Sequence, residues 1–388
     1  MAIRESKIKL TFLVRSLDHG GTQRQLVTLA KALNKKQFEP TVIAFYSGYA
    51  LEKELAAAGI PLISLRKRGR WDALGFSIRL IRELQRSRPD ILHSYLDIPN
   101  LLALFARLFV STRVVWGIRT SEIYLNHYDW LRCLSAKLER LGSRFADLII
   151  VNSSAGYQRH IAMGFPAEKM VVIPNGVNTG EFRPDEVARQ KQRSQWSIGN
   201  DRKLVGIIGR LDPMKDHDLF LQAASLVSRV RSDVRFVCVG GGPPQYAESL
   251  RANAAVSKLS DQVLWAGAMD NMPSAYNALD LLVSASVAEG FSNVIAEGMA
   301  CGVPCVVTDV GDSAWLVGDT GIVVPPSDAR ALAEGLLTIL DSDPRELGLR
   351  ARTRIVENFN AQQLSERTEL ELLSLLRSSA EQVTSTAR

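Results

Sequence analysis

The chain has 388 residues, of which 46% are hydrophobic and 23% are charged, and its formal net charge is +6. This length is too great for one ordinary core and predicts two domains of about 150–200 residues each in a globular protein. No apolar run reaches the roughly 18 residues of a membrane span, and the four cysteines lack zinc-site spacing, so we expect reduced thiols in a cytosolic protein.

The positive charge is concentrated in the first half of the chain. Residues 1–182 contain 26 Lys and Arg against 15 Asp and Glu, a balance of +11, whereas the remainder contains 21 against 26, a balance of −5. The densest basic cluster is RKRGRW, at residues 66–71. It suits either a solvated loop or a patch that faces a membrane. No nucleic-acid recognition motif accompanies it, so we expect no nucleic-acid partner.

Predicted strands and helices alternate along the first half. Its apolar strands are expected over residues 7–15, 40–46, 61–65, 90–96, 113–120, 146–153 and 169–173, with helical patterns in most of the intervals between them. The short apolar run after the basic start is a first strand rather than a signal peptide. This alternation predicts a doubly wound α/β domain with a parallel sheet.

Several polar or flexible residues follow these strands. Gly20 and Gly21 form a turn after the first strand, where glycine lets the backbone approach a ligand. His93 is expected at the end of the fourth strand, and Arg119 and Glu122 at the end of the fifth. Open α/β sheets bind ligands at this carboxyl edge.

A polar, charge-dense stretch over residues 181–202 separates the two halves, and a second β/α series follows it. Within that series EGFSNVIAEGMACGVP places Glu289 in a loop before a short helix. Ser292 is the expected N-cap of this helix and Gly302 its expected C′ residue. The free N–H groups at the helix start suit a phosphate, and the carboxylates of Glu289 and Glu297 suit sugar hydroxyls.

Other polar features follow neighbouring strands of the second half. They are Arg210 with Lys215, the loop 240–242 and the segment around Gly267. Because the carboxyl ends of parallel strands share one edge, we expect these groups to converge with Glu289. Two cations, a glycine loop, a helix N-terminus and two carboxylates together predict a site for a nucleotide diphosphate that carries a sugar.

The segments GRLDPMKDHDLFLQA and EGFSNVIAEGMACGVPCVVTDVGDSAWLVGDTGIVVPPSD resemble the retaining family 4 glycosyltransferases of the GT-B fold (glycosyl transferases group 1). GGTQRQ, ADLIIVNSS, VIPNGVN and VGGGP support the resemblance. It implies two Rossmann-like doubly wound parallel-sheet domains that face each other across a cleft. We expect an acceptor-binding domain over residues 1–182, a nucleotide-sugar-binding domain over 183–365, and a helix over 366–388 that packs back on the first domain.

The resemblance also implies roles for single residues. Arg210 and Lys215 would stabilise the leaving diphosphate, so that neither a metal ion nor a cofactor is needed beside a UDP- or GDP-sugar donor. Glu289 would bind hydroxyls of the donor sugar and Glu297 those of the ribose. The implied donor-binding set is Gly20, Gly21, Gly241, Gly267, Met269, Gly290, Phe291, Ser292, Asn293 and Glu297. Many relatives carry a histidine where this chain has Arg119, so Arg119, Glu122 and His93 are the acceptor-side candidates.

The reaction implied by the resemblance is a sugar transfer with retention of anomeric configuration. The leaving phosphate accepts the proton of the acceptor hydroxyl; a double displacement with Glu289 as nucleophile is the alternative chemistry. The acceptor is expected to be a lipid-linked or envelope glycan, met at the inner face of the cytoplasmic membrane by the basic first half. A nucleotide-sugar epimerase of the same fold and a non-catalytic nucleotide-sugar-binding homologue are the alternative functions.

Overall fold

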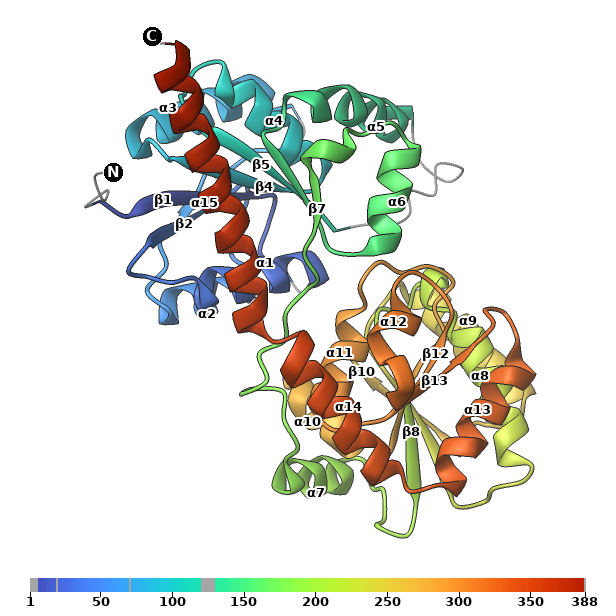
Figure 1. The fold of residues 1–388 in the computed structure, drawn as a ribbon. Coiled ribbons are helices and arrows are strands. Elements are labelled where there is room, and N and C mark those ends of the chain that lie inside the picture. Colours follow the sequence, from blue (N-terminus) through green and yellow to red (C-terminus); the bar gives the residue numbers. More distant parts are fainter. Residues whose placement is uncertain (1–5, 19, 70, 120–129, 387–388) are drawn as a thin grey trace. The chain divides into compact units, whose positions relative to one another are not determined.

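The computed structural model describes residues 6–18, 20–69, 71–119 and 130–386 and divides into two compact units (Figure 1). The first unit comprises Met1–Gly176 and Ala361–Arg388, and the second comprises Val177–Asn360. Each unit contains one parallel β-sheet, of seven strands in the first and six in the second.

The strands of the first unit are β1 (Ile8–Val14), β2 (Phe38–Ala44), β3 (Leu62–Ser64), β4 (Ile91–Tyr95), β5 (Arg113–Ile118), β6 (Leu148–Val151) and β7 (Met170–Val172). Its helices are α1 (Gly21–Ala32), α2 (Glu52–Ala57), α3 (Ala73–Ser87), α4 (Asp97–Arg107), α5 (Trp130–Gly142), α6 (Ser154–Ala162) and α15 (Ala361–Thr386), with 3₁₀ turns η2 (Ser143–Phe145) and η3 (Ala167–Lys169).

The first sheet has the strand order β3-β2-β1-β4-β5-β6-β7. Buried side chains of α1, α2 and α15 pack on one face of this sheet, and buried side chains of α3 and α4 with partly buried ones of α6 pack on the other. Both faces are therefore covered, which explains why β1 is apolar along nearly its whole length. From β1 the strands are added toward β3 on one side, and from β4 they are added toward β7 on the other, so the strand order reverses between β1 and β4. The carboxyl ends of the strands at such a point form the usual ligand crevice.

The last helix of the chain belongs to this first unit. Leu364 and Leu372 of α15 are buried in the same core cluster as α1, and Glu369 accepts a hydrogen bond from the backbone N–H of Asn34 at 2.8 Å. Figure 1 shows α15 running alongside α1. The helix begins at Ala361, five residues before the start expected from the sequence.

The strands of the second unit are β8 (Lys203–Ile208), β9 (Val234–Val239), β10 (Val263–Gly267), β11 (Leu281–Ser284), β12 (Cys305–Thr308) and β13 (Gly321–Val324). Its helices are α7 (Glu186–Gln195), α8 (His217–Ser228), α9 (Pro244–Val256), α10 (Met272–Ala278), α11 (Asn293–Ala300), α12 (Ser313–Val317), α13 (Ala329–Asp341) and α14 (Pro344–Asn358), with 3₁₀ turns η4 (Pro213–Lys215) and η5 (Gly318–Thr320).

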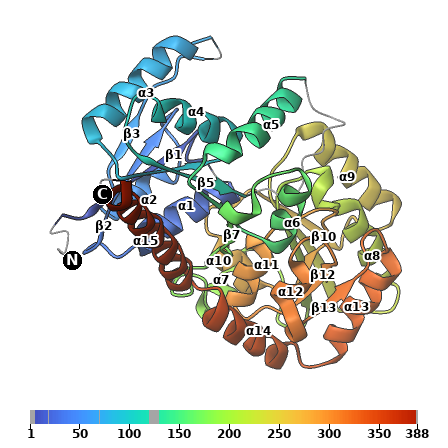
Figure 2. The ribbon, with the colours of Figure 1, turned by 45° about the horizontal axis from the view of Figure 1, so that its top comes forward.

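The second sheet has the order β10-β9-β8-β11-β12-β13 and two hydrophobic clusters, one on each face. Helices α8, α9 and α13 supply one cluster, and α10, α11, α12 and α14 supply the other, as the second view helps to follow (Figure 2). Three cysteines with described side chains, Cys238, Cys301 and Cys305, are free thiols buried in these clusters.

The polar stretch 181–202, which the sequence suggested as a linker, is folded into the second unit. It contains α7, whose Arg193 side chain is only 2% exposed and donates to the carbonyl of Ala278 and to the carboxylate of Asp280. The units divide instead at 176/177 and 360/361, where Val177 forms an isolated parallel bridge with Asn360. These positions differ by six and five residues from the boundaries expected at 182/183 and 365/366.

Candidate active site

Lys215 and Glu289 meet at the carboxyl edge of the second sheet. Lys215 closes η4 after β8, Glu289 lies in the loop after β11, and the ammonium of Lys215 donates to Oε1 of Glu289 in an ion pair. The hydroxyl of Ser286 donates to the same oxygen at 2.8 Å. The side chains of Lys215 and Glu289 are 25% and 12% exposed and line a recess with Ser292, at the start of α11.

The position of Lys215 is fixed by a cap on each side. Asp212 accepts from the N–H of Met214 at 2.9 Å and so begins η4. Asp216 adopts a left-handed conformation with φ of 45° and accepts from the N–H of Leu219 at 3.0 Å, which begins α8. The sequence DPMKD is thus a 3₁₀ turn between two capping aspartates, and it holds the lysine next to the recess.

Arg210 occupies a different environment from Lys215. Its side chain is 76% exposed, and its ion pair is with Asp212 at 3.5 Å rather than with Glu289. Arg210 therefore lies on the surface of the connection that also carries Lys215, where it is available to an anion from solvent. The two cations predicted from the sequence come from one β–α connection, but only the lysine is held by the acid.

The glycines at the ends of β8 and β9 allow two loops to touch. Leu211 donates its N–H to the carbonyl of Gly241 at 2.9 Å. A Cβ atom at Gly240 would lie 1.8 Å from the carbonyl oxygen of Gly209, and one at Gly242 would lie 2.4 Å from that of Leu211. Gly241 itself is exposed, so it remains accessible to a ligand at this edge. Gly240 and Gly242 are thus required for loop packing.

A similar contact holds the loop of Glu289. Asp312 donates its N–H to the carbonyl of Gly290 at 3.0 Å. Gly311 has φ of +59°, and a Cβ atom there would lie 2.2 Å from the carbonyl oxygen of Glu289. The loop that follows β12 therefore packs against the backbone of the acidic residue and can do so only with glycine at 311.

Helix α11 begins and ends where the sequence predicted. Ser292 is the N-cap residue, but its side chain forms no capping hydrogen bond. At the other end Gly302 has φ of +76°, and Val303 donates to the carbonyl of Gly298 at 3.0 Å, as in a Schellman motif. Helix α11 thus starts at Asn293, next to the recess that Ser292 lines.

Glu297 lies one turn into this helix and is half-buried. It accepts a hydrogen bond from the hydroxyl of Tyr276 at 2.8 Å. Burial, followed by the charge of Glu297, raises the pKa of Tyr276 well above its usual value, so this hydroxyl stays a donor. Phe291 packs against Phe359 with 5.6 Å between ring centroids, which leaves its backbone as the part available to a ligand.

Gly267 is the last residue of β10, and Met269 follows this strand. Gly267 has φ of +71° and follows an irregularity in the β10–β9 register, and its carbonyl accepts from Gly240 at 2.8 Å. Met269 is half-buried against the cluster of α10 and α11. The connections after β8, β9 and β10 are therefore hydrogen-bonded to one another, as the parallel-sheet argument predicted.

His217 and Ser286 are two residues of this edge that the sequence did not single out. His217 is fully buried, and burial, followed by the charge of Lys215, lowers its pKa to about 4. Neither ring nitrogen has a hydrogen-bond partner among the described residues. A neutral histidine beside Lys215 leaves the lysine as the charged group there. The only feature of the sequence that could have indicated the hydrogen bond from Ser286 to Glu289 is their separation of three residues within one loop.

The acceptor-side candidates lie in the first unit, except that Glu122 falls outside the described residues. His93 is in the middle of β4, fully buried, with its ring stacked on Tyr95 at 4.6 Å between centroids. Burial, followed by the charge of Arg119, lowers the pKa of His93 to about 3. Arg119 directly follows β5 and donates to Oδ1 of Asn175 at 2.5 Å. His93 is thus a core residue at this place rather than the strand-end group expected from the sequence.

The Gly20–Gly21 turn precedes α1 in the first unit. Gly20 has φ of −122°, which any residue adopts, and Gly21 is the first helical residue. A Cβ atom at Gly20 would meet only the flexible end of Gln23. Neither the extended backbone of Gly20 nor the helical position of Gly21 requires glycine.

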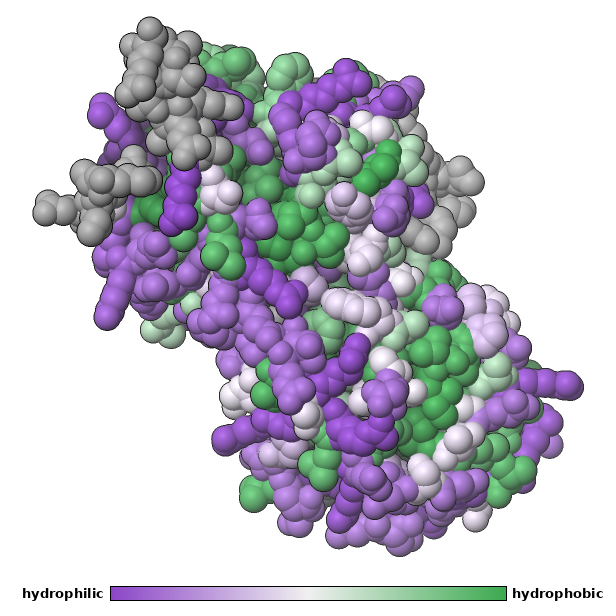
Figure 3. Space-filling view, viewed as in Figure 1, coloured by the Kyte–Doolittle hydropathy of each residue, from purple (hydrophilic) through white to green (hydrophobic). Residues whose placement is uncertain are grey.

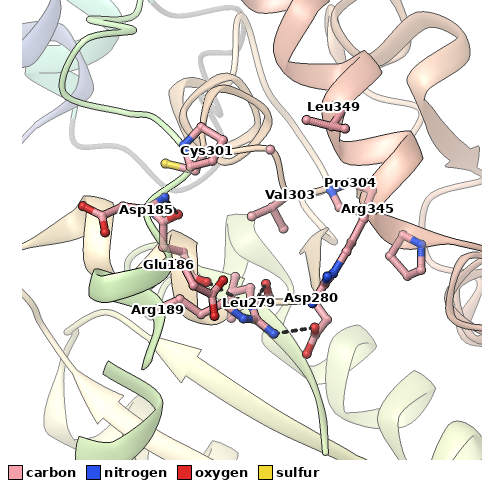
Figure 4. A pocket seen from close by; sticks show the side chains of 14 residues that line it. Asp185, Glu186, Arg189, Leu279, Asp280, Cys301, Val303, Pro304, Arg345 and Leu349 are labelled. Carbon is pink, nitrogen blue, oxygen red and sulfur yellow. Dashed lines mark hydrogen bonds and ion pairs between the residues drawn. The ribbon is translucent and has the colours of Figure 1, made fainter. Parts of the chain in front are cut away.

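A larger cavity of about 450 Å³ lies at the opposite edge of the second sheet (Figure 4). Its lining includes Asp280 and Pro304, which precede β11 and β12, and Arg189, whose guanidinium pairs with Asp280 at 2.7 Å. Ligands of parallel sheets bind at the carboxyl ends of the strands, so this amino-edge cavity is not the candidate site. Among the described side chains, no group of three or more His, Cys, Asp or Glu could hold a metal ion.

Two protein families have models that match this chain. The model described as Glycosyltransferase Family 4 matches residues 19–181, and the model described as Glycosyl transferases group 1 matches residues 202–342. The two matches fall on the first and second units and together span most of the sequence.

Relatives and solved structures agree with these matches. A lipopolysaccharide core biosynthesis mannosyltransferase of Rhizobium meliloti is 33% identical over 203 residues, 50% of this chain and 57% of the relative. An alpha-1,4-N-acetyl-D-galactosaminyltransferase of Campylobacter jejuni, whose name gives a diphospho-undecaprenol-linked acceptor, is 26% identical over 87% of this chain and 90% of its own length. The crystal structure of Anabaena HepE with UDP-glucose superposes with a TM-score of 0.83 at 22% identity, covering 95% of this chain and all of that one.

Proposed function

The chain is a family 4 glycosyltransferase of the GT-B fold, and we propose that it transfers a hexose from a nucleotide-diphosphate-sugar to a glycan hydroxyl with retention of configuration. The observation that carries the proposal is the Lys215–Glu289 pair beside the N-terminus of α11. A cation, a helix N-terminus and a carboxylate held by hydrogen bonds are the groups that a diphosphate joined to a sugar needs.

Each group acts on a different part of the donor. Lys215 and the exposed Arg210 stabilise the negative charge that develops on the leaving diphosphate, together with the N–H groups that follow Ser292. Oε2 of Glu289 accepts hydrogen bonds from hydroxyls of the donor sugar. Oε1 accepts the bonds from Lys215 and Ser286, which fix the position of the carboxylate. Glu297 receives the ribose hydroxyls, and the segment from Gly267 to Met269 lines the base.

In the reaction the bond between the anomeric carbon and the diphosphate oxygen breaks, and the acceptor oxygen bonds to that carbon from the same face. The acceptor proton passes to a leaving phosphate oxygen, so no protein base is required. The ion pair with Lys215 and the bond from Ser286 both reduce the nucleophilicity of Glu289, which favours a hydroxyl-binding role for it over a covalent intermediate. Lys215 and Arg210 neutralise the charge of the diphosphate, a role that a metal ion has in other enzymes.

The donor assignment is tested by a thermal-shift screen of the full chain against UDP- and GDP-sugars. Binding raises the unfolding temperature as the free ligand exceeds its Kd. We expect one nucleotide-sugar to stabilise the wild type and to lose most of this effect in Lys215→Ala. Lys203→Ala, at the opposite end of β8, is the matched control and should respond as the wild type does. An undiminished shift in Lys215→Ala would show that the donor binds elsewhere.

The acceptor we propose is a lipid-linked or envelope glycan. The support comes from the relatives, since the Campylobacter jejuni and Rhizobium meliloti proteins are named for lipid-linked and lipopolysaccharide glycans. Both are transferases, which favours transfer over the epimerase and the non-catalytic alternatives. Turnover of the donor only in the presence of a glycan acceptor is the expected result, and epimerised donor without acceptor would contradict it.

We also propose that the first unit binds an anionic membrane surface. Exposed apolar side chains that directly follow α4 and α5 include Leu108 at 77%, Phe109 at 50% and Phe145, in η2, at 68%. Arg107 of α4 donates to the carbonyl of Phe145, so a cation lies among them. Figure 3 shows hydrophobic surface over α4 with hydrophilic surface beside it. No helix in the described part of the chain is both long and apolar enough to cross a bilayer.

Vesicle flotation tests this surface. An exposed apolar side chain that enters the headgroup region contributes to binding, and anionic lipid adds attraction for the basic unit. Leu108→Asp should reduce binding to phosphatidylglycerol vesicles. Val187→Asp, at 78% exposure in the second unit, is the matched control and should bind as the wild type does. Equal binding by Leu108→Asp would remove this surface from the proposal.

A further inference from the structure

Arg119 is a buried cation without a described acidic partner. Its side chain directly follows β5 at the carboxyl edge of the first sheet and is 9% exposed. The guanidinium lies over the ring of Tyr95, 5.2 Å from the centroid, and donates to Oδ1 of Asn175. Among the residues that the structure describes, no carboxylate forms an ion pair with it.

The hydrogen-bonding capacity of Arg119 is also only partly used. A guanidinium has five N–H donors, and two of them form hydrogen bonds with described residues, one of which is the long 3.5 Å contact with the hydroxyl of Tyr95. Its Nε atom is buried and has no partner within the described part of the chain. A buried charge without a counter-ion and a buried donor without an acceptor both reduce stability, so a site that keeps them has another use for them.

The neighbouring backbone and side chains are consistent with such a use. Leu96, directly after β4, has φ of 72° and ψ of 167°, a conformation that is strained for any residue but glycine. His93 and Tyr95 are stacked beneath Arg119 and bring no negative charge, since burial holds His93 neutral and keeps Tyr95 protonated. Strain next to a cation that has no counter-ion among the described residues, at the ligand edge of the sheet, is the combination expected of a binding site.

We propose that Arg119 is the receptor for an oxyanion carried by the acceptor, a phosphate or a carboxylate, which its fork-shaped guanidinium binds through Nε and a terminal nitrogen. This inference rests on the proposed function and on the expectation from the sequence that the first domain binds the acceptor. It makes the acceptor an anionic glycan or the diphosphate end of a lipid-linked glycan. Asn175 and Tyr95 position the guanidinium, so they act through it.

The test separates this site from the donor site by removing the donor cations. In the full-length Arg210→Ala/Lys215→Ala variant, inorganic pyrophosphate should still raise the unfolding temperature relative to sodium chloride of equal ionic strength. Adding Arg119→Gln should weaken the apparent pyrophosphate affinity by at least about tenfold, as expected for loss of a charge-assisted hydrogen bond. Adding Arg119→Lys, which keeps the charge and the fold but not the fork, should cause a smaller loss.

Two further ligands identify the source of the oxyanion, and one further variant serves as a control. A short prenyl diphosphate carries the group of a lipid head, and glucuronate carries that of an acidic sugar; the larger Arg119-dependent shift identifies the acceptor class. Arg79→Gln, which removes a cation already paired with Asp72 in the same unit, is the control and should leave every shift unchanged.

Three results would overturn the inference: a pyrophosphate shift that Arg119→Gln leaves intact, no shift with any of the three anions, or an equal loss of nucleotide-sugar affinity when Arg119→Gln is made in the wild type. Because wild-type nucleotide-sugar binding is measured separately, a protein that fails to bind any donor contradicts the proposed function and leaves the Arg119 measurement valid.

Discussion

Glu139→Gln should change how the stability of the first unit depends on pH. Glu139 is buried on α5 and accepts a hydrogen bond from the side-chain amide of Asn100 on α4 at 2.9 Å. Asn100 in turn accepts from the hydroxyl of Ser94 at 2.7 Å. Burial raises the pKa of Glu139 from 4.5 to about 7; the bond from Asn100 opposes this rise and the charge of Asp97 adds to it.

The direction of this pH dependence follows from the number of protons bound by the folded and the unfolded protein. Between pH 4.5 and about pH 7 the folded protein holds the proton of Glu139 and the unfolded chain does not, so unfolding releases a proton. The free energy of unfolding therefore falls as pH rises through this window, and the stabilising effect of the proton is complete only below the unfolded value. At about 1.4 kcal/mol for each pH unit, the loss reaches about 3 kcal/mol.

Glutamine keeps the acceptor oxygen for Asn100 but carries no charge at any pH. The free energy of unfolding of Glu139→Gln should therefore equal that of the wild type near pH 4.5 and exceed it by about 3 kcal/mol near pH 8. Urea denaturation of both proteins over this range measures it, and amide hydrogen exchange in α4 and α5 locates it. Glu168→Gln, an exposed substitution in the same unit, is the control and should give a difference that does not vary with pH. Parallel stability curves for the wild type and Glu139→Gln would refute the reasoning.

The other predictions concern the second unit. Lys215→Ala should lower turnover by roughly 10²–10³, measured as kcat with saturating donor, and a loss below about tenfold would contradict its role on the diphosphate. Arg210→Ala should also slow turnover but change the free energy of unfolding by less than about 0.5 kcal/mol, because the side chain is 76% exposed. Turnover should persist in EDTA without added magnesium, and a requirement for the ion would show that the two cations do not suffice. Gly311→Ala should cost more than about 1 kcal/mol in denaturation and weaken donor binding, since its Cβ atom would meet the carbonyl of Glu289 at 2.2 Å; unchanged donor affinity would show that this loop does not position the acid.

The alternation of strands and helices could be predicted from the sequence because it depends on local periodicity. Buried parallel strands are apolar along their length, and their carboxyl ends share an edge, so the convergence of Lys215 and Glu289 followed from order alone. The unit boundaries could not be predicted in the same way. Residues 181–202 are polar in composition, yet Arg193 is buried by groups some 85 residues further along the chain, at Ala278 and Asp280.

The burial and the partners of single side chains could not be predicted from the sequence either. His93 was expected at a strand end, but its burial depends on the pairing of β4 with β1, which sets it opposite Phe12, and on the stacking of Tyr95. No local pattern encodes that register. Arg210 and Lys215 lie five positions apart in one connection and differ threefold in exposure, 76% against 25%, because only the lysine reaches an acid from another loop.

The glycines that follow strands of the second unit are explained by close contacts between loops. A glycine-rich loop at a strand end is usually taken as a place where the backbone meets a phosphate. Here Gly240 and Gly242 are required because Gly209 and Leu211 of the neighbouring loop lie against them, and Gly311 is required because the backbone of Glu289 lies against it. The loops are therefore packed on one another before any ligand is bound. A site built in this way needs little reorganisation when negative charge develops on the diphosphate, which is the condition under which fixed cations and N–H groups are most effective.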